Sequence, residues 1–137
     1  LETNRSLRAQ ASWRNRPVSS FANFEAPCVR SWTKAEVEKI LQKSPDTIFT
    51  LLNKEDYPTG IVERTQLESF LETGKTPLHQ NPIFAYPDQT MQDIELLLKK
   101  APLGSLILVS QNQRYLGLFT SSDATQSQKN EDELANS

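Results

Sequence analysis

The chain has 137 residues, enough for one domain or for two small repeats that share a core. Its formal net charge of -2 argues against nucleic acid as the main partner. No apolar stretch approaches the roughly 20 residues that a membrane span needs, there is no signal peptide, and the single cysteine, Cys28, excludes an internal disulfide. We therefore expect a cytoplasmic protein that does not insert into a membrane, and the leading Leu1 suggests a piece of a longer chain.

The N-terminal segment carries arginines but few apolar side chains, and Pro17 interrupts any regular structure. We predict that residues 1–25 form an extended arm or linker. The alternative is a segment that packs on the following domain or on a partner through Trp13, Phe21 and Phe24. A nucleic-acid-binding arm is disfavoured, because the arginines are not part of a wider basic field.

The sequence pattern over residues 26–73 predicts a strand, a helix, two strands and a second helix. A capping box formed by Thr33 and Glu36 begins the first helix, and Pro45 ends it. The elements predicted after it are strands over residues 48–52 and 57–62 and a helix over residues 63–72 that Gly74 ends.

The same order returns over residues 82–126, after a connector over residues 74–81. Asp88 or Thr90 can cap the first helix of this half, whose apolar positions have helical spacing. The predicted elements are an extended run over residues 83–86, that helix with Met91, Ile94, Leu97 and Leu98, strands over 106–109 and 115–120, and a closing helix. Residues 127–137 lack apolar periodicity, and we predict that they form a disordered polar tail.

The two halves form an internal repeat. A shift of 57 residues places the stretch Gly60-Ile61-Val62 on Gly117-Leu118-Phe119, and residues 49–52 on residues 106–109. One unit of about 45 residues cannot bury much apolar surface alone. We therefore expect an α+β (α/β) fold in which two β-α-β-β-α units pack together.

The stretch Gly117-Leu118-Phe119-Thr120-Ser121-Ser122-Asp123 closes the second half. A hydroxyl three positions before a carboxylate, at the start of a helix with free amides, can hold a ribose and its phosphate. The alternative is ordinary helix capping, for which Thr, Ser and Asp are common residues.

The duplicated unit resembles a tandem pair of cystathionine-β-synthase (CBS) domains. The resemblance is carried by Pro87-Asp88-Gln89-Thr90 before the helix, by the apolar strand Leu106-Ile107-Leu108-Val109, and by the closing stretch Gly117 to Asp123. It implies a regulatory module whose two units pack sheet to sheet around a pseudo-twofold axis. It also implies two clefts between the units, where many family members bind adenosine-containing ligands.

Site residues follow from the resemblance by position. Asp123 would accept hydrogen bonds from ribose hydroxyls, and Thr120 with Ser121 or Ser122 would face the ribose or the first phosphate. The adenine slot would be lined by Ile83, Phe84 and Ala85. The implied regulatory ligands are AMP, ADP, ATP or S-adenosylmethionine, with no required cofactor and no metal.

The first copy departs from the closing pattern, because Glu63-Arg64-Thr65-Gln66 lacks both the Thr and the Asp. Glu63 would repel a phosphate, and Gln66 is a poorer ribose acceptor than Asp. We therefore expect the first-repeat site to be empty or altered. Arg64 can be a solvated charge at a helix start or a contact for an unusual anion.

We predict a signalling role for the module rather than catalysis, because no catalytic constellation is present in the sequence. Ligand binding would be relayed to an attached domain of the parent protein. The apolar run Leu96-Leu97-Leu98 exceeds what one helix face needs, and it suggests a homodimer formed through the CBS helices. The alternative function is a ligand-free structural or dimerisation module.

Overall fold

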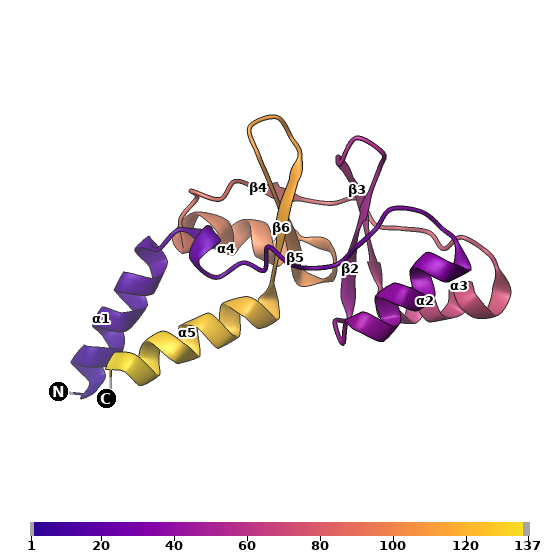
Figure 1. The fold of residues 1–137 in the computed structure, drawn as a ribbon. Helices are drawn as coiled ribbons and strands as arrows, with labels where there is room; N and C mark the ends of the chain where they lie inside the picture. The colour runs from indigo at the N-terminus through magenta and orange to yellow at the C-terminus, as the bar shows by residue number, and fades with distance from the viewer. Residues whose placement is uncertain (1, 136–137) are drawn as a thin grey trace.

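The computed structural model describes residues 2–135 and contains two three-stranded sheets that lie between two groups of helices (Figure 1). The predicted order β-α-β-β-α is confirmed in both halves. The first repeat consists of β1 (Cys28–Val29), α2 (Lys34–Lys43), β2 (Ile48–Leu52), β3 (Pro58–Glu63) and α3 (Arg64–Thr73). The second consists of β4 (Phe84–Ala85), α4 (Met91–Lys100), β5 (Ser105–Val109), β6 (Tyr115–Thr120) and α5 (Ser121–Ala135). Before them come α1 (Glu2–Asn15) and a 3-10 turn (Val18–Ser20), and a second 3-10 turn (Pro102–Gly104) precedes β5.

The 57-residue shift describes the antiparallel pair of each sheet residue by residue, whereas the short parallel strands β1 and β4 are related by 56 residues. Each sheet has a parallel pair and an antiparallel pair, in the orders β1-β2-β3 and β4-β5-β6. Leu51 faces Gly60 in the first sheet, as Leu108 faces Gly117 in the second. The register shifts immediately after Leu51 and immediately after Leu108, so even the irregularity is repeated.

The two sheets pack face to face, and each receives an added segment from the other half of the chain. Asn23, which precedes the first repeat, pairs with Leu118 of β6, and Gln80, which precedes the second, pairs with Ile61 of β3. These two bridges are related by the same shift, as pseudo-twofold symmetry requires. The apolar contact between the sheets is made by Ala26, Ile61, Ile107, Val109 and Leu118.

Helix caps follow the predictions in part. Thr33 accepts a hydrogen bond from the amide of Glu36, but the Glu36 carboxylate accepts from the amides of Arg30 and Ser31 instead of returning the bond to Thr33. In the second repeat the cap is Thr90, which forms a reciprocal capping box with Asp93. Within residues 2–135, no helix has both the length and the apolar character to cross a membrane.

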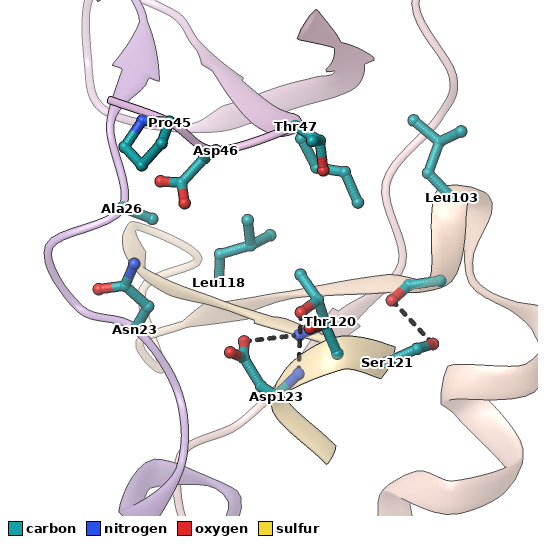
Figure 2. A pocket seen from close by; sticks show the side chains of 13 residues that line it. Asn23, Ala26, Pro45, Asp46, Thr47, Leu103, Leu118, Thr120, Ser121 and Asp123 are labelled. Carbon is teal, nitrogen blue, oxygen red and sulfur yellow. Dashed lines mark hydrogen bonds between the residues drawn. The ribbon is translucent and has the colours of Figure 1, made fainter. Parts of the chain in front are cut away.

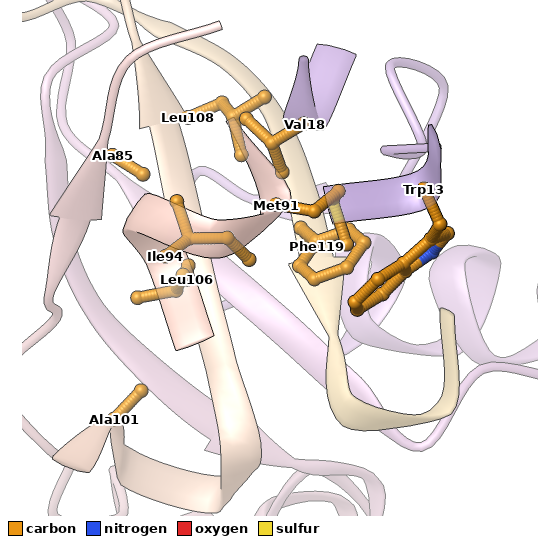
Figure 3. Close-up of a cluster of buried hydrophobic side chains, with 9 residues drawn as sticks. All are labelled: Trp13, Val18, Ala85, Met91, Ile94, Ala101, Leu106, Leu108 and Phe119. Atoms are coloured by element: carbon orange, nitrogen blue, oxygen red, sulfur yellow. The ribbon is translucent and has the colours of Figure 1, made fainter. Parts of the chain in front are cut away.

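The prediction of an extended arm over residues 1–25 is wrong. Glu2–Asn15 is a helix, and Trp13 and Val18 lie in the core of the second repeat, at 4% and 0% exposure (Figure 3). The alternative of packing on the following domain holds for Trp13 and, partly, for half-buried Phe21, whereas Phe24 is exposed.

The N-terminal helix packs on the second repeat because the last helix of that repeat has smaller core side chains than its counterpart in the first. In the first repeat, Leu67 and Phe70 of α3 fill the core. The shift places these positions on Ala124 and Ser127 of α5, which are too small to fill the same space. Trp13 of α1 supplies the missing ring, and its Nε1–H donates a hydrogen bond to the buried Ser127 Oγ at 2.9 Å.

The predicted disorder of residues 127–137 is also wrong for the described part of that segment. α5 continues to Ala135, and residues 136–137 lie outside the described residues. The helix is held against α1 by the Trp13 bond and by an ion pair between Arg16 and Glu131 at 2.7 Å. Its own sequence shows little apolar periodicity because α1 brings the apolar side chain to the contact.

Replacing Trp13 with Ala should lower the free energy of unfolding by about 3–5 kcal/mol, the usual cost of truncating a buried aromatic side chain. Chemical denaturation followed by circular dichroism measures this. The matched control is Leu7→Ala on the same helix, where the side chain is 58% exposed and the change should stay within about 0.5 kcal/mol. Equal losses in the two variants would contradict the role given to Trp13.

Candidate functional site

A cavity of about 450 Å³, called the main cavity below because the closing stretch of the second repeat lines it, lies between the two repeats (Figure 2). One wall is the end of β6 and the first turn of α5. The segment before β1 extends this wall, because Asn23 pairs with Leu118 of β6. The loop before β2 of the first repeat forms the opposite wall, and the 3-10 turn before β5 closes one side. Its lining residues are Asn23, Ala26, Pro45, Asp46, Thr47, Ile48, Leu103, Gly104, Leu118, Thr120, Ser121, Ser122 and Asp123.

The closing stretch of the second repeat forms a helix cap at this cavity. The amide of Thr120 donates to Asp123 Oδ2 at 3.0 Å, and the amide of Asp123 donates to Thr120 Oγ1 at 3.2 Å (Figure 2). Both side chains are half-buried. The capping role of Thr120 and Asp123 is therefore a feature of the structure, and it holds the Asp123 carboxylate in a fixed position on the cavity wall.

The two serines of the closing stretch also lie on this wall. Ser121 Oγ donates to the carbonyl of Gly104 at 3.2 Å, which ties the start of α5 to the 3-10 turn. The first-turn amides of Ser121 and Ser122 have no acceptor within the helix, as in any α-helix. The structure thus places Thr120, Ser121, Ser122 and Asp123 on one wall of the cavity.

The structure does not bring Ile83, Phe84 and Ala85 to this cavity. β4 lies at the opposite edge of its sheet from β6, Ala85 is enclosed in the core of the second repeat, and Ile83 packs against that core. The segment that faces β6 is the one before the first repeat, which contributes Asn23 and Ala26. Because this segment crosses between repeats, only the tertiary pairing identifies it, and a comparison of the two copies in sequence gives no signal for it.

Asp46 is a lining residue that the sequence reasoning missed. It follows the end of α2, and its carboxylate accepts a hydrogen bond from Ser44 Oγ at 2.8 Å. Asp46 and Asp123 lie on opposite walls (Figure 2), and no lining residue within the described part of the chain is a lysine or an arginine. The side chains of the cavity therefore supply negative charge, hydroxyl groups and apolar surface.

A second, smaller cavity of about 370 Å³ lies near the start of α3, at the corresponding place in the first repeat. Here Glu63 and Gln66 occupy the positions of Thr120 and Asp123, and Gln66 Oε1 accepts from the amide of Glu63 at 2.9 Å. The cap is conserved in geometry, but two carboxylates, of Glu63 and Glu68, lie at this cavity. The chemistry of the two cavities therefore differs.

Arg64 is not the solvated charge at a helix start that was one of the two roles considered from the sequence. Its guanidinium donates to the carbonyls of Leu41 at 2.9 Å and Ser44 at 2.7 Å, at the end of α2, and to that of Asp46 at 3.2 Å. A cation at a helix C-terminus is stabilising because the last carbonyls carry partial negative charge. Arg64 of the degenerate copy thus fixes the loop that carries Asp46 into the main cavity.

The lone cysteine lies beside the main cavity without lining it. Cys28 Sγ donates to the carbonyl of Ala26 at 3.6 Å, and the hydroxyl of Tyr115 donates to the same carbonyl at 3.4 Å. Burial raises the pKa of the Cys28 thiol and also that of the Tyr115 hydroxyl. The thiol is therefore protonated at neutral pH, which makes it a poor nucleophile.

Arg64→Met should lower the free energy of unfolding by about 1.5–3 kcal/mol, because it keeps the aliphatic stem but removes charged hydrogen bonds to the end of α2. Thermal and chemical denaturation measure the loss. Lys39→Met, at an exposed position of α2, is the control and should change stability by less than about 0.5 kcal/mol. A loss no larger than that of the control would show that Arg64 does not hold the helix end.

Comparison by sequence finds neither a matching family model nor a matching curated protein. Solved structures match in fold. The CBS domain pair of protein MJ0100, in complex with 5′-methylthioadenosine and S-adenosyl-L-methionine, is 19% identical with a TM-score of 0.64, over 81% of this chain and 98% of that chain. The CBS-pair protein CBSX2 from Arabidopsis thaliana is 12% identical with a TM-score of 0.69, over 85% and 96%. The CBS domain of the bacterial CNNM/CorC family Mg2+ transporter is 15% identical with a TM-score of 0.74, over 92% and 82%. At such low identities the likeness is one of fold.

Proposed function

This chain has the fold of a CBS domain pair, and we propose that it is a non-catalytic regulatory module that binds one adenosyl ligand between its repeats. The observation that carries the proposal is the main cavity, where the Thr120 and Asp123 cap of the second repeat faces Asp46 of the first. Ligand binding would favour one arrangement of the repeats and so act on an attached domain of the parent protein.

Different lining residues suit different parts of an adenosyl ligand. One oxygen of Asp123 caps Thr120, and the other can accept a hydrogen bond from a ribose hydroxyl. Ile48, Leu103 and Leu118 offer apolar surface on which an adenine ring can lie. The first-turn amides of Ser121 and Ser122 point a partial positive charge at whatever group follows the ribose.

The charge of the cavity favours ligands with few or no phosphates. Among AMP, ADP, ATP and S-adenosylmethionine, the proposal favours S-adenosylmethionine or a neutral thioadenosine, because Asp46 and Asp123 repel a triphosphate and attract a sulfonium or ammonium group. The solved pair of protein MJ0100 contains both kinds of adenosyl compound. The first-repeat cavity, with Glu63 and Glu68, is proposed to stay without a nucleotide.

A ligand-free module that dimerises is the second candidate function. It is favoured by Leu96 of α4, whose side chain is 68% exposed, with half-buried Leu97 and Leu98 beside it. Light scattering of the wild type and of Leu96→Lys distinguishes the two: a dimer that this substitution dissociates, with no ligand binding, would favour the second candidate.

Saturating 5′-methylthioadenosine should raise the melting temperature of the wild type, since a ligand at 100 times its Kd adds about 2.7 kcal/mol to the unfolding free energy. Asp123→Ala should abolish this shift, as measured by differential scanning fluorimetry. That variant also removes a helix cap, so Asp93→Ala, which breaks the equivalent capping box of α4 away from the cavity, is the control. The control should lose stability and keep the shift; a shift that survives in Asp123→Ala would contradict the assigned site.

Asp46→Asn should raise the affinity for ATP by about tenfold while changing the affinity for methylthioadenosine little, because removing one nearby charge acts on the phosphates at short range. Isothermal titration calorimetry at low salt measures both. Asp88→Asn, at an exposed acidic residue outside this cavity, is the control. An equal change for both ligands would show that Asp46 does not set the charge preference.

A further inference from the structure

We propose that occupancy of the main cavity is coupled to the docking of α1 on α5, so that this helix pair transmits the presence of the ligand. This coupling rests on the proposed function and adds to it the element that would respond to the ligand, which is α1. α1 and α5 lie side by side and project together from the second repeat, and the start of α1 lies beside the end of α5 (Figure 1). A change in their packing therefore reaches both ends of the described chain.

Both helices of the pair connect to the wall of the main cavity that β6 and the first turn of α5 form. α5 begins there, at Ser121. α1 is connected to the same wall through the 3-10 turn and Asn23, whose amide and carbonyl pair with Leu118 at 2.9 and 3.0 Å. A ligand that contacts Asn23 and Asp123 therefore touches the base of both helices at once.

The docking of α1 combines packing along α5 with polar contacts at and just after the C-terminal end of α1. Trp13 donates to Ser127, Arg16 pairs with Glu131, and the exposed Arg14 pairs with Glu95 of α4 at 3.4 Å. The Arg16 guanidinium also lies 5.1 Å from the centre of the Phe21 ring. These contacts lie outside the two sheets, so a ligand can strengthen or weaken them without unfolding the sheets.

Asp123 connects the cavity to these contacts. It lines the main cavity and also a small cavity of about 180 Å³ between Phe21 and α5, together with Ser127 and Glu131. Ser127 lies one turn after Asp123, on the same face of the helix. A ligand hydroxyl bound to Asp123 fixes the first turn of α5, and the next turn presents the acceptor of Trp13 and the partner of Arg16.

The test uses Trp13 as its own reporter. The chain has two tryptophans, so Trp32→Phe leaves Trp13 alone. With 5′-methylthioadenosine bound, acrylamide quenching of Trp13 should fall and hydrogen exchange of α1 amides should slow by about fivefold or more, the low end of common coupling energies. The amides of α3, which does not line the main cavity, should not change.

Linkage provides the reciprocal measurement, because a ligand that tightens docking must bind less well when docking is weakened. Ser127→Ala and Glu131→Gln should each lower the affinity for methylthioadenosine in calorimetry, whereas Lys129→Ala, at an exposed position of the same helix, should not. Ligand binding with unchanged quenching and exchange in α1 would overturn the coupling and leave the proposed function standing. Absence of calorimetric binding at millimolar methylthioadenosine would overturn the proposed function and the coupling with it.

Discussion

The second repeat depends on a side chain that comes from outside it. Trp13 occupies the part of the core that Phe70 fills in the first repeat, and its indole N–H meets the hydroxyl of Ser127, the residue at the corresponding place in α5. Without that ring, α5 would present Ala124 and Ser127 to an underfilled core, and a cavity of aromatic size costs several kcal/mol. The helix that opens the chain is therefore part of the second repeat.

The two copies also depend on each other at the main cavity. Their closing turns keep one backbone geometry, a reciprocal cap, with different side chains: Thr120 and Asp123 in one, Glu63 and Gln66 in the other. Arg64, which follows Glu63 in the first repeat, donates hydrogen bonds to the carbonyls of Ser44 and Asp46, and it thereby holds the loop that carries Asp46. The copy that lacks the Thr and the Asp of the closing stretch thus supports a wall of the cavity that the other copy lines with them.

The sequence predicted the elements whose signals are local. Apolar periodicity, the turn residues and the 57-residue shift located both sheets and four of the helices, and the pattern at Thr120 and Asp123 located one wall of the cavity. The errors concern elements whose stability comes from distant partners. α1 and the end of α5 have weak apolar faces because they pack on each other and on the indole of Trp13. Residues Ile83, Phe84 and Ala85 were expected at the cavity, but the linkers cross between the repeats and bring Asn23 there instead. Such pairing is a tertiary property that local propensity does not encode.

The crossed linkers make the two repeats interdependent in folding. Asn23 adds to the sheet of the second repeat and Gln80 to that of the first, so a half-molecule cut between the repeats would lack an edge of its own sheet and expose backbone groups of β3 or β6. The bridge from Asn23 to Leu118 also closes a loop over most of the chain, and contacts this distant in sequence slow folding. An ancestral single repeat with this topology would have needed a second copy of itself to complete its sheet, and the duplicated chain keeps that exchange within one molecule.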